Sequence, residues 1–245
     1  MSDTIYSEQA ADSRLPAPRP AQPLVLAQSV QAIDRSVKER NDVDHPLMNW
    51  WLAYLIVIPF TFSIYQIVLW FRWVGRVDRF RARKERYYNA VGDFTAQYAE
   101  STGRLDAVSG DLRTLKQQVD DAFALQIRPI NAGLCFVLSI VTLGIWALVV
   151  VYKLNKAWYT LMVIERNYDE QLSKIWQKLG LLKYPLTFNV DATKQRSYVG
   201  YLVLSVVTLS IWWFVWLYKI HTDPDRIYAE FHGVEDTVLQ TVRAA

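Results

Sequence analysis

Three long apolar segments interrupt the polar sequence of this chain. They run over 47–71, 134–152 and 198–218, and none of them contains a charged residue. A helix needs roughly 20 apolar residues to cross the hydrocarbon layer of a membrane, and each segment is about that long. The pattern therefore predicts an all-α integral membrane protein built on three apolar helical segments.

Amphipathic helices are expected between and beside these segments. From Val77 to Gln126 apolar residues recur at three- and four-residue intervals, which is a heptad seam. Gly103 lies within the seam, so the region forms either one long helix or a helical hairpin. Such a seam must be covered, either by the chain itself or by another copy. Asp223 and Pro224 predict a fresh helix start near the C-terminus.

This pattern divides the chain into nine parts. The Pro-rich N-terminal part is expected to be disordered, because its composition buries too little apolar surface to offset its ordering entropy. The parts are the tail over 1–23, an amphipathic helix over 24–45, membrane segments over 46–73, 128–156 and 198–221, the heptad region over 74–127, an amphipathic helix over 157–180, a loop over 181–197 and an amphipathic helix over 222–245.

A short motif occurs in all three apolar segments. It consists of Thr, Leu or Phe, Gly or Ser, Ile and an aromatic residue, followed after five intervening residues by an aromatic residue and a base. Such repetition indicates one structural unit used three times. Its small polar residues indicate a bend or a close contact between helices. The motif positions are Thr61, Ser63, Tyr65 and Arg72, then Thr142, Gly144, Trp146 and Lys153, then Thr208, Ser210, Trp212 and Lys219.

With this Thr-Leu-Gly-Ile-aromatic…Tyr-Lys signature the chain resembles a prokaryotic membrane-protein family known as domain of unknown function 4234. The resemblance covers 129–156 and 198–221 well and 55–73 loosely. The first copy departs from the signature at Pro59, Phe62, Ser63 and Arg72. It implies an integral protein of a prokaryotic inner (cytoplasmic) membrane. It brings no activity.

Basic residues predict which parts of the chain are cytoplasmic. The net charge is only +3, but the positive residues are clustered. Lys and Arg accumulate on the cytoplasmic side of membrane segments, and a cluster next to a membrane is expected to contact anionic lipids. The expected lipid contacts are Arg76, Arg79, Arg81, Arg83, Lys84 and Arg86.

The charge pattern leaves two topologies open. The loop 153–197 is also rich in basic residues, yet one simple span would put it on the opposite side from 72–86. Either each apolar segment is a re-entrant hairpin that returns to the side it left, or all three span. Hairpin limbs of ~10 residues reach only ~15 Å, about half the hydrocarbon thickness.

The sequence contains no catalytic, cofactor-binding or metal-binding constellation. His45, His221 and His232 are far apart, and Cys135 is the single cysteine, so no disulfide is possible within one chain. No ionisable residue lies inside an apolar segment, which argues against a coupled transporter. We therefore expect a non-enzymatic membrane-embedded scaffold or assembly subunit with cytoplasmic helices, and a channel or transporter subunit is the alternative. The expected partners are membrane lipids and either further copies of the chain or another membrane protein, without nucleic acid, cofactor or identifiable small-molecule substrate.

Overall fold

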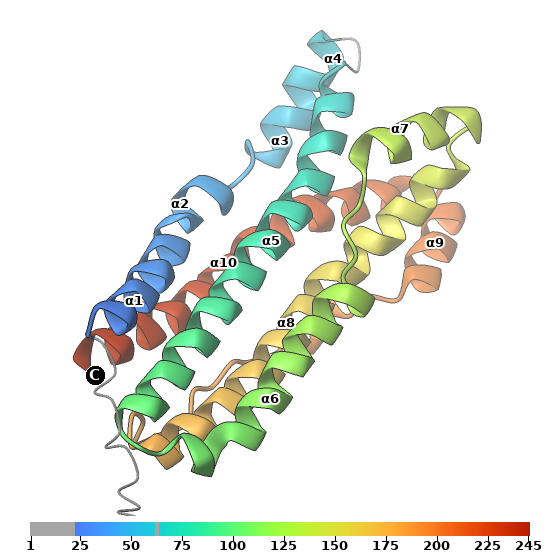
Figure 1. Cartoon of the computed structure of the whole chain (residues 1–245). Coiled ribbons are helices and arrows are strands. Elements are labelled where there is room, and N and C mark those ends of the chain that lie inside the picture. Colours follow the sequence, from blue (N-terminus) through green and yellow to red (C-terminus); the bar gives the residue numbers. More distant parts are fainter. Residues whose placement is uncertain (1–22, 62–63) are drawn as a thin grey trace, which may run out of the picture.

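Three long helices run along the molecule and form its centre (Figure 1). The computed structural model describes residues 23–61 and 64–245. Two further helices pack against the central three: α1 contacts α5 and α10, and α6 contacts α5 and α8. The described residues contain no β-strand, which confirms the all-α prediction. These five helices are α1 (Pro23–Lys38), α5 (Ile64–Ser101), α6 (Leu105–Asp121), α8 (Ile145–Leu179) and α10 (Ile211–Ala244).

Each apolar segment folds back on itself as a hairpin. A short limb runs away from the bundle, the chain turns, and the first part of a long helix returns (Figure 1). Hairpins 1, 2 and 3 lead into α5, α8 and α10, respectively. The short limb of hairpin 1 comprises α3 (Trp50–Leu52), the π-helical turn η1 (Ala53–Val57) and α4 (Ile58–Phe60), that of hairpin 2 is α7 (Ala132–Val141), and that of hairpin 3 is α9 (Tyr198–Val207).

The remaining elements are short connections. They are α2 (Arg40–Val43), the π-helical turn η2 (Ala122–Gln126) and the 3-10 turn η3 (Ala192–Lys194). Of the predicted parts, the tail over 1–23 falls almost wholly outside the described residues, as does motif residue Ser63.

The repeated threonine joins the two limbs of each hairpin. The hydroxyl of Thr142 donates to the carbonyl of Leu138 (2.7 Å) and accepts from the backbone N–H of Trp146 (2.9 Å). One hydroxyl thus binds a carbonyl in the last turn of one helix and a backbone N–H in the first turn of the next. The same two bonds recur at Thr61, with Val57 and Tyr65, and at Thr208, with Leu204 and Trp212. The four-residue spacing from threonine to aromatic residue in the motif follows from this geometry.

The third motif residue reverses the chain in the left-handed backbone region. Gly144 has φ 89°, and Ser210 has φ 74° at the equivalent position. The N–H of Gly144 donates to the carbonyl of Ser139 (2.7 Å), as in a helix C-terminal cap. A Cβ atom added to Gly144 would meet no atom within 4 Å. The motif therefore makes a bend, and the alternative of a close helix contact at this glycine is wrong.

The heptad region is a hairpin within one chain. α5 ends at Ser101, Gly103 adopts φ 67°, and α6 packs back on α5. The seam side chains are buried between helices of the same chain, so they do not leave a stripe for a coiled coil between copies. Those buried are Val77, Phe80, Lys84, Tyr87, Val91, Phe94, Val108, Leu115, Val119 and Ala122.

The fresh start predicted near the C-terminus is wrong. α10 continues without a break from the apolar hairpin to Ala244, with Pro224 inside it. The carboxylate of Asp223 does not cap a helix, because it is bound by the guanidinium of Arg196 at 2.6 Å. Likewise α8 joins the predicted segments 128–156 and 157–180 in one helix.

We predict that Gly144→Ala destabilises the protein by about 1 kcal/mol, because an L-residue in the left-handed region costs roughly that much. Gly92→Ala is the matched control. Its added Cβ also meets no atom within 4 Å, but Gly92 lies inside α5, where alanine is favoured by roughly 0.5–1 kcal/mol. Denaturant unfolding in detergent measures both. Changes of the same sign would contradict this account of the turn.

Candidate membrane interface and buried ion network

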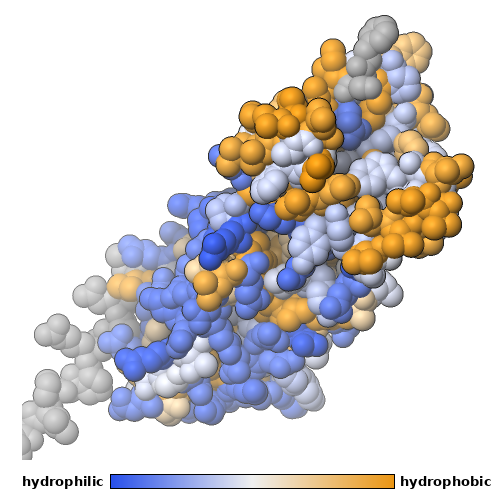
Figure 2. Space-filling view, turned by 90° about the vertical axis from the view of Figure 1, so that its right-hand side faces the viewer, coloured by the Kyte–Doolittle hydropathy of each residue, from blue (hydrophilic) through white to orange (hydrophobic). Residues whose placement is uncertain are grey.

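Exposed apolar side chains are concentrated on the three hairpins. Among the described residues, all but four of the exposed large hydrophobic side chains belong to them. The turns are the most exposed parts, with Leu143 at 94%, Leu209 at 89% and Phe60 at 80%. Figure 2 shows these side chains gathered at one end of the molecule, while the opposite end is hydrophilic. An apolar end of this kind marks an interaction site for a membrane or a protein.

Aromatic contacts join the hairpins into a closed ring. In each repeat the aromatic residue before the motif's base contacts the short limb of another hairpin. Hairpin 1 contacts hairpin 2, hairpin 2 contacts hairpin 3, and hairpin 3 contacts hairpin 1. The pairs are Phe71 with Phe136 (5.5 Å between ring centroids), Tyr152 with Tyr198 (5.1 Å) and Tyr218 with Trp50 (5.4 Å). Such pairs favour one mutual orientation of the hairpins.

The motif's basic residues form a collar at the base of the hairpins. Arg72, Lys153 and Lys219 each follow the first residue of their long helix by eight positions, which is about 12 Å along the helix axis. Arg72 and Lys153 are exposed. Lys219 is half-buried, with its Nζ 5.6 Å from the ring centroid of Tyr218. We call these three residues the collar.

The other motif residues stabilise the turns. Thr61, Thr142 and Thr208 use their hydroxyls within the hairpins, as described above. Tyr65, Trp146 and Trp212 are half-buried beside them. The threonine bonds show that these motif residues serve the bend of each hairpin.

Beyond the collar, four ionic side chains meet inside the bundle. The Nζ of Lys84 lies 2.8 Å from Glu165 Oε1 and 3.1 Å from Glu235 Oε1. The adjacent Arg83 binds both carboxylate oxygens of Glu235, at 2.9 and 3.0 Å, and Asp44 at 2.8 Å. Lys84, Arg83, Glu165 and Glu235 are fully buried. Together with Asp44 they form what we call the ion network, which connects α5, α8 and α10.

Aromatic rings enclose the ammonium group of Lys84. Its Nζ lies 4.6 Å from the ring centroid of Tyr87 and 4.7 Å from those of Tyr88 and Phe231. Desolvated cation–π contacts of this kind are attractive. The hydroxyl of Tyr88 donates to the other oxygen of Glu165. The lysine therefore has its charge compensated and its surroundings filled.

Three of the six lipid contacts predicted from the basic cluster are wrong, because these side chains are buried and paired inside the bundle. Arg83 and Lys84 are fully buried, and Arg76 is 2% exposed and paired with Asp225. Their side chains cannot reach a membrane surface because they lie inside the bundle.

The other three residues of the basic cluster lie nearer the surface. Arg79 is exposed and Arg86 is exposed and paired with Glu39. The half-buried Arg81 donates to the carbonyls of Ile127 (2.6 Å) and Phe123 (3.0 Å). Its side chain thereby holds the segment that leads into hairpin 2.

The positions around Lys84 recur with the motif. Twelve residues after its collar base, each repeat contributes one buried side chain, and four residues later it contributes another. The first layer is Lys84, Glu165 and Phe231, and the second layer is Tyr88, Asp169 and Glu235. The sequence analysis missed the acids Glu165, Asp169 and Glu235. Aligning the three repeats at their collar bases would have shown that these acids occupy positions equivalent to Lys84 and Tyr88.

Burial and charge act in opposite directions on the buried acids. Burial raises the pKa of Glu235, but Lys84 and Arg83 outweigh it and hold that pKa below its usual value. For Glu165 burial prevails, and its pKa is raised despite Lys84. Burial and the charge of Glu165 raise the pKa of Asp169 well above its usual range. Its Oδ2 has no hydrogen-bond partner among the described residues.

Two of the three histidines, His221 and His232, have structural partners. His221 accepts from the indole N–H of Trp73 (3.3 Å), and its other nitrogen lies 2.7 Å from the carbonyl of Met48. His232 contacts the carboxylate of Asp44 at 2.8 Å. In the part of the chain that the structure describes, no three His, Cys, Asp or Glu side chains are grouped to hold a metal ion.

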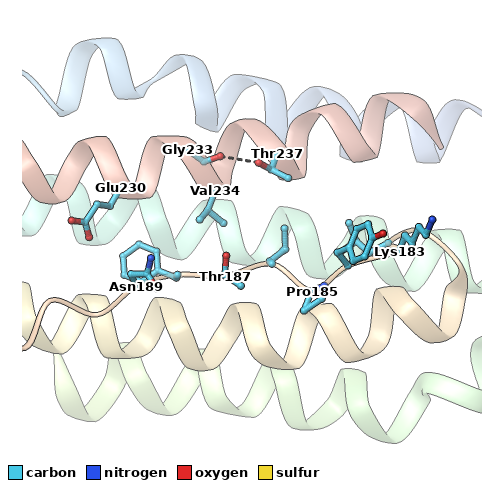
Figure 3. Close-up of a pocket in the computed structure, with 12 residues that line it drawn as sticks. Lys183, Pro185, Thr187, Asn189, Glu230, Gly233, Val234 and Thr237 are labelled. Carbon is cyan, nitrogen blue, oxygen red and sulfur yellow. Dashed lines mark hydrogen bonds between the residues drawn. The ribbon is translucent and has the colours of Figure 1, made fainter.

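A groove of about 610 Å³ lies at the polar part of the bundle, between the connection after α8 and helix α10 (Figure 3). The connection is held in place because the N–H of Leu186 donates to Ser173 Oγ (2.8 Å) and Phe188 packs 4.9 Å from Phe231. The lining of this groove combines Lys183 and Glu230 with apolar and hydroxyl side chains. The labelled residues are Lys183, Pro185, Thr187, Asn189, Glu230, Gly233, Val234 and Thr237.

No protein-family model matches the chain, and neither a curated protein nor a solved structure matches it. The resemblance to domain of unknown function 4234 rests on the repeated motif alone. Among the described helices, only α8 is long and apolar enough to cross a membrane by length and composition, and 39% of its apolar window is buried inside the protein.

We predict that Lys84→Met destabilises the protein by about 3–5 kcal/mol, because it leaves the buried carboxylate of Glu165 without its cation. Lys178→Met is the control. Lys178 lies on the surface with its Nζ 2.6 Å from Asp111, and such exposed pairs contribute at most about 1 kcal/mol. Denaturant unfolding of both variants in detergent measures the difference. Equal losses would show that the buried lysine has no special role.

Proposed function

We propose that the protein is a monotopic, non-enzymatic membrane protein whose three hairpins enter one leaflet and hold the helical bundle at the cytoplasmic face as a scaffold. The observation that carries this proposal is the exposed apolar end of three hairpins bounded by the collar. The distance of about 12 Å from turn to collar is less than half of the hydrocarbon thickness of about 30 Å. Hairpins of this length therefore fit within one leaflet of the membrane.

The turns meet the main requirement for such insertion. Backbone polar groups in the hydrocarbon layer must be satisfied within the protein, since no water is present to bind them. In hairpins 2 and 3, the bonds of Thr142, Thr208, Gly144 and Ser210 pair backbone groups of the turn. The apolar side chains of Leu143 and Leu209 face outward from these turns.

Hairpins also reconcile the charge pattern with the positive-inside rule. If each apolar segment returns to the side it left, the basic regions 72–86 and 153–197 lie on the same side of the membrane. Lys and Arg favour the cytoplasmic side. The proposal therefore places both regions, and the bundle that they belong to, in the cytoplasm.

The tips provide the first test. We predict that Leu143→Glu combined with Leu209→Glu abolishes binding to phosphatidylcholine vesicles, because charged residues in hydrocarbon cost several kcal/mol. Leu105→Glu combined with Tyr184→Glu is the matched control, since both residues are exposed but lie outside the hairpins. The control is expected to bind like the parent protein. Vesicle flotation measures binding, and circular dichroism checks that both variants remain helical. Undiminished binding of the tip variant would contradict the proposal.

Sidedness provides the second test. In a Cys135→Ala background, single cysteines replace the exposed residues Asn89 and Glu170. We predict that an impermeant thiol reagent labels neither position in intact cells and both after lysis. If the three apolar segments span the membrane instead, position 170 is labelled from outside. Labelling of position 170 in intact cells would overturn the monotopic arrangement while leaving membrane insertion intact.

A further inference from the structure

Two neighbouring cavities lie beside the collar, next to hairpins 2 and 3. Their volumes are about 610 and 230 Å³. They share part of their lining, so they lie side by side along α8, and we call the two together the collar groove. The shared residues are Leu125, Gln126, Tyr152, Lys156 and Thr160.

The collar groove is lined by cations without acids. Four cations line it, and no Asp or Glu belongs to the lining of either cavity. One of them, Arg196, is paired with Asp223 at 2.6 Å. The other three are Arg128, Lys153 and Lys156. No carboxylate of the described residues forms an ion pair with these three side chains. Three other cavities each include an acid in their lining, namely Glu230, Asp121, or Asp93 with Asp120. The groove is therefore suited to an anion.

The position of the groove adds an apolar neighbour to this charge. Lys153 and Lys156 are three residues apart on α8, so they point to the same side of the helix. Tyr152 is exposed at the edge of the groove, and Ile145, two turns closer to the tip, is exposed on hairpin 2. A bound molecule can thus place its anionic group among the cations of the groove. An apolar chain of the same molecule can lie along hairpin 2.

We propose that the collar groove binds the phosphate of one anionic phospholipid, whose acyl chains lie against hairpin 2. This proposal rests on the proposed insertion of the hairpins into a membrane. Lys and Arg form charge-assisted hydrogen bonds to phosphate oxygens, and tyrosine hydroxyls of Tyr152 and Tyr159 lie in the same lining. The predicted lipid contact of the chain thus moves from the buried Arg83 and Lys84 to the cations of the groove.

The test uses the full chain in detergent, titrated with phosphatidylglycerol, with bound lipid counted by native mass spectrometry. We expect one retained lipid per chain in the parent protein. Lys153→Gln combined with Lys156→Gln should weaken this binding roughly 30-fold, because each of the two cations lost accounts for about a factor of five. Arg72→Gln combined with Lys219→Gln removes the same charge from the collar but lies outside the groove, and it should bind like the parent.

An equal loss of phosphatidylglycerol affinity in the two double variants would overturn the site. Diffuse attraction to a positive surface depends on the total charge and not on which cations carry it. Glycerol phosphate, added in place of the lipid, separates the lipid from a free phosphate. Binding as tight as that of phosphatidylglycerol would overturn the lipid as occupant, because acyl chains would then contribute nothing. Flotation with pure phosphatidylcholine vesicles separates this proposal from the previous one. The groove variant should still float with them, whereas a parent protein that fails to float refutes hairpin insertion itself.

Discussion

The buried ammonium group of Lys84 constrains the arrangement of all three repeats. A charge without a partner in a protein interior is very costly, and the compensating carboxylates come from the other two long helices, Glu165 on α8 and Glu235 on α10. Both distances hold only when the three helices have one rotation and one axial position relative to each other. The network thus contributes specificity more than stability, because well-packed apolar residues of similar volume often stabilise as much as a buried ion pair does.

That register determines how the apolar end is assembled. If the hairpins enter lipid as proposed, apolar burial gives little driving force for their association with one another. The orientation has to come from the bundle, where water is present, and from specific contacts such as the ring pair of Tyr152 and Tyr198. Because each long helix continues from its hairpin into the bundle without a break, the ion network and the aromatic ring position the same rigid elements from two ends.

The sequence alone predicted the helices, the repeats and the apolar segments, but it gave two incompatible expectations for Lys84. The heptad spacing placed this residue on the covered seam, whereas the count of nearby positive charges placed it on the membrane surface. The spacing was right, because periodicity reports which face a side chain occupies, while a count of charges does not. The return of the chain at the motif could not be predicted in the same way. Gly144 is a sequence signal for a left-handed turn, but Leu143 and Ser210, which also have positive φ, are not.

α8 links the proposed membrane contacts to the centre of the bundle. Lys153 lies about 12 Å from the start of this helix at Ile145, and Glu165 lies about 30 Å from it, at 1.5 Å per residue. A rotation of α8 that moves Lys153 relative to a bound phosphate therefore also moves Glu165 relative to Lys84. Since separating that buried pair is costly, the helix resists such rotation, and the collar groove keeps its shape whether or not it is occupied. A lipid that binds a preformed groove of this kind does not have to supply the free energy of ordering it.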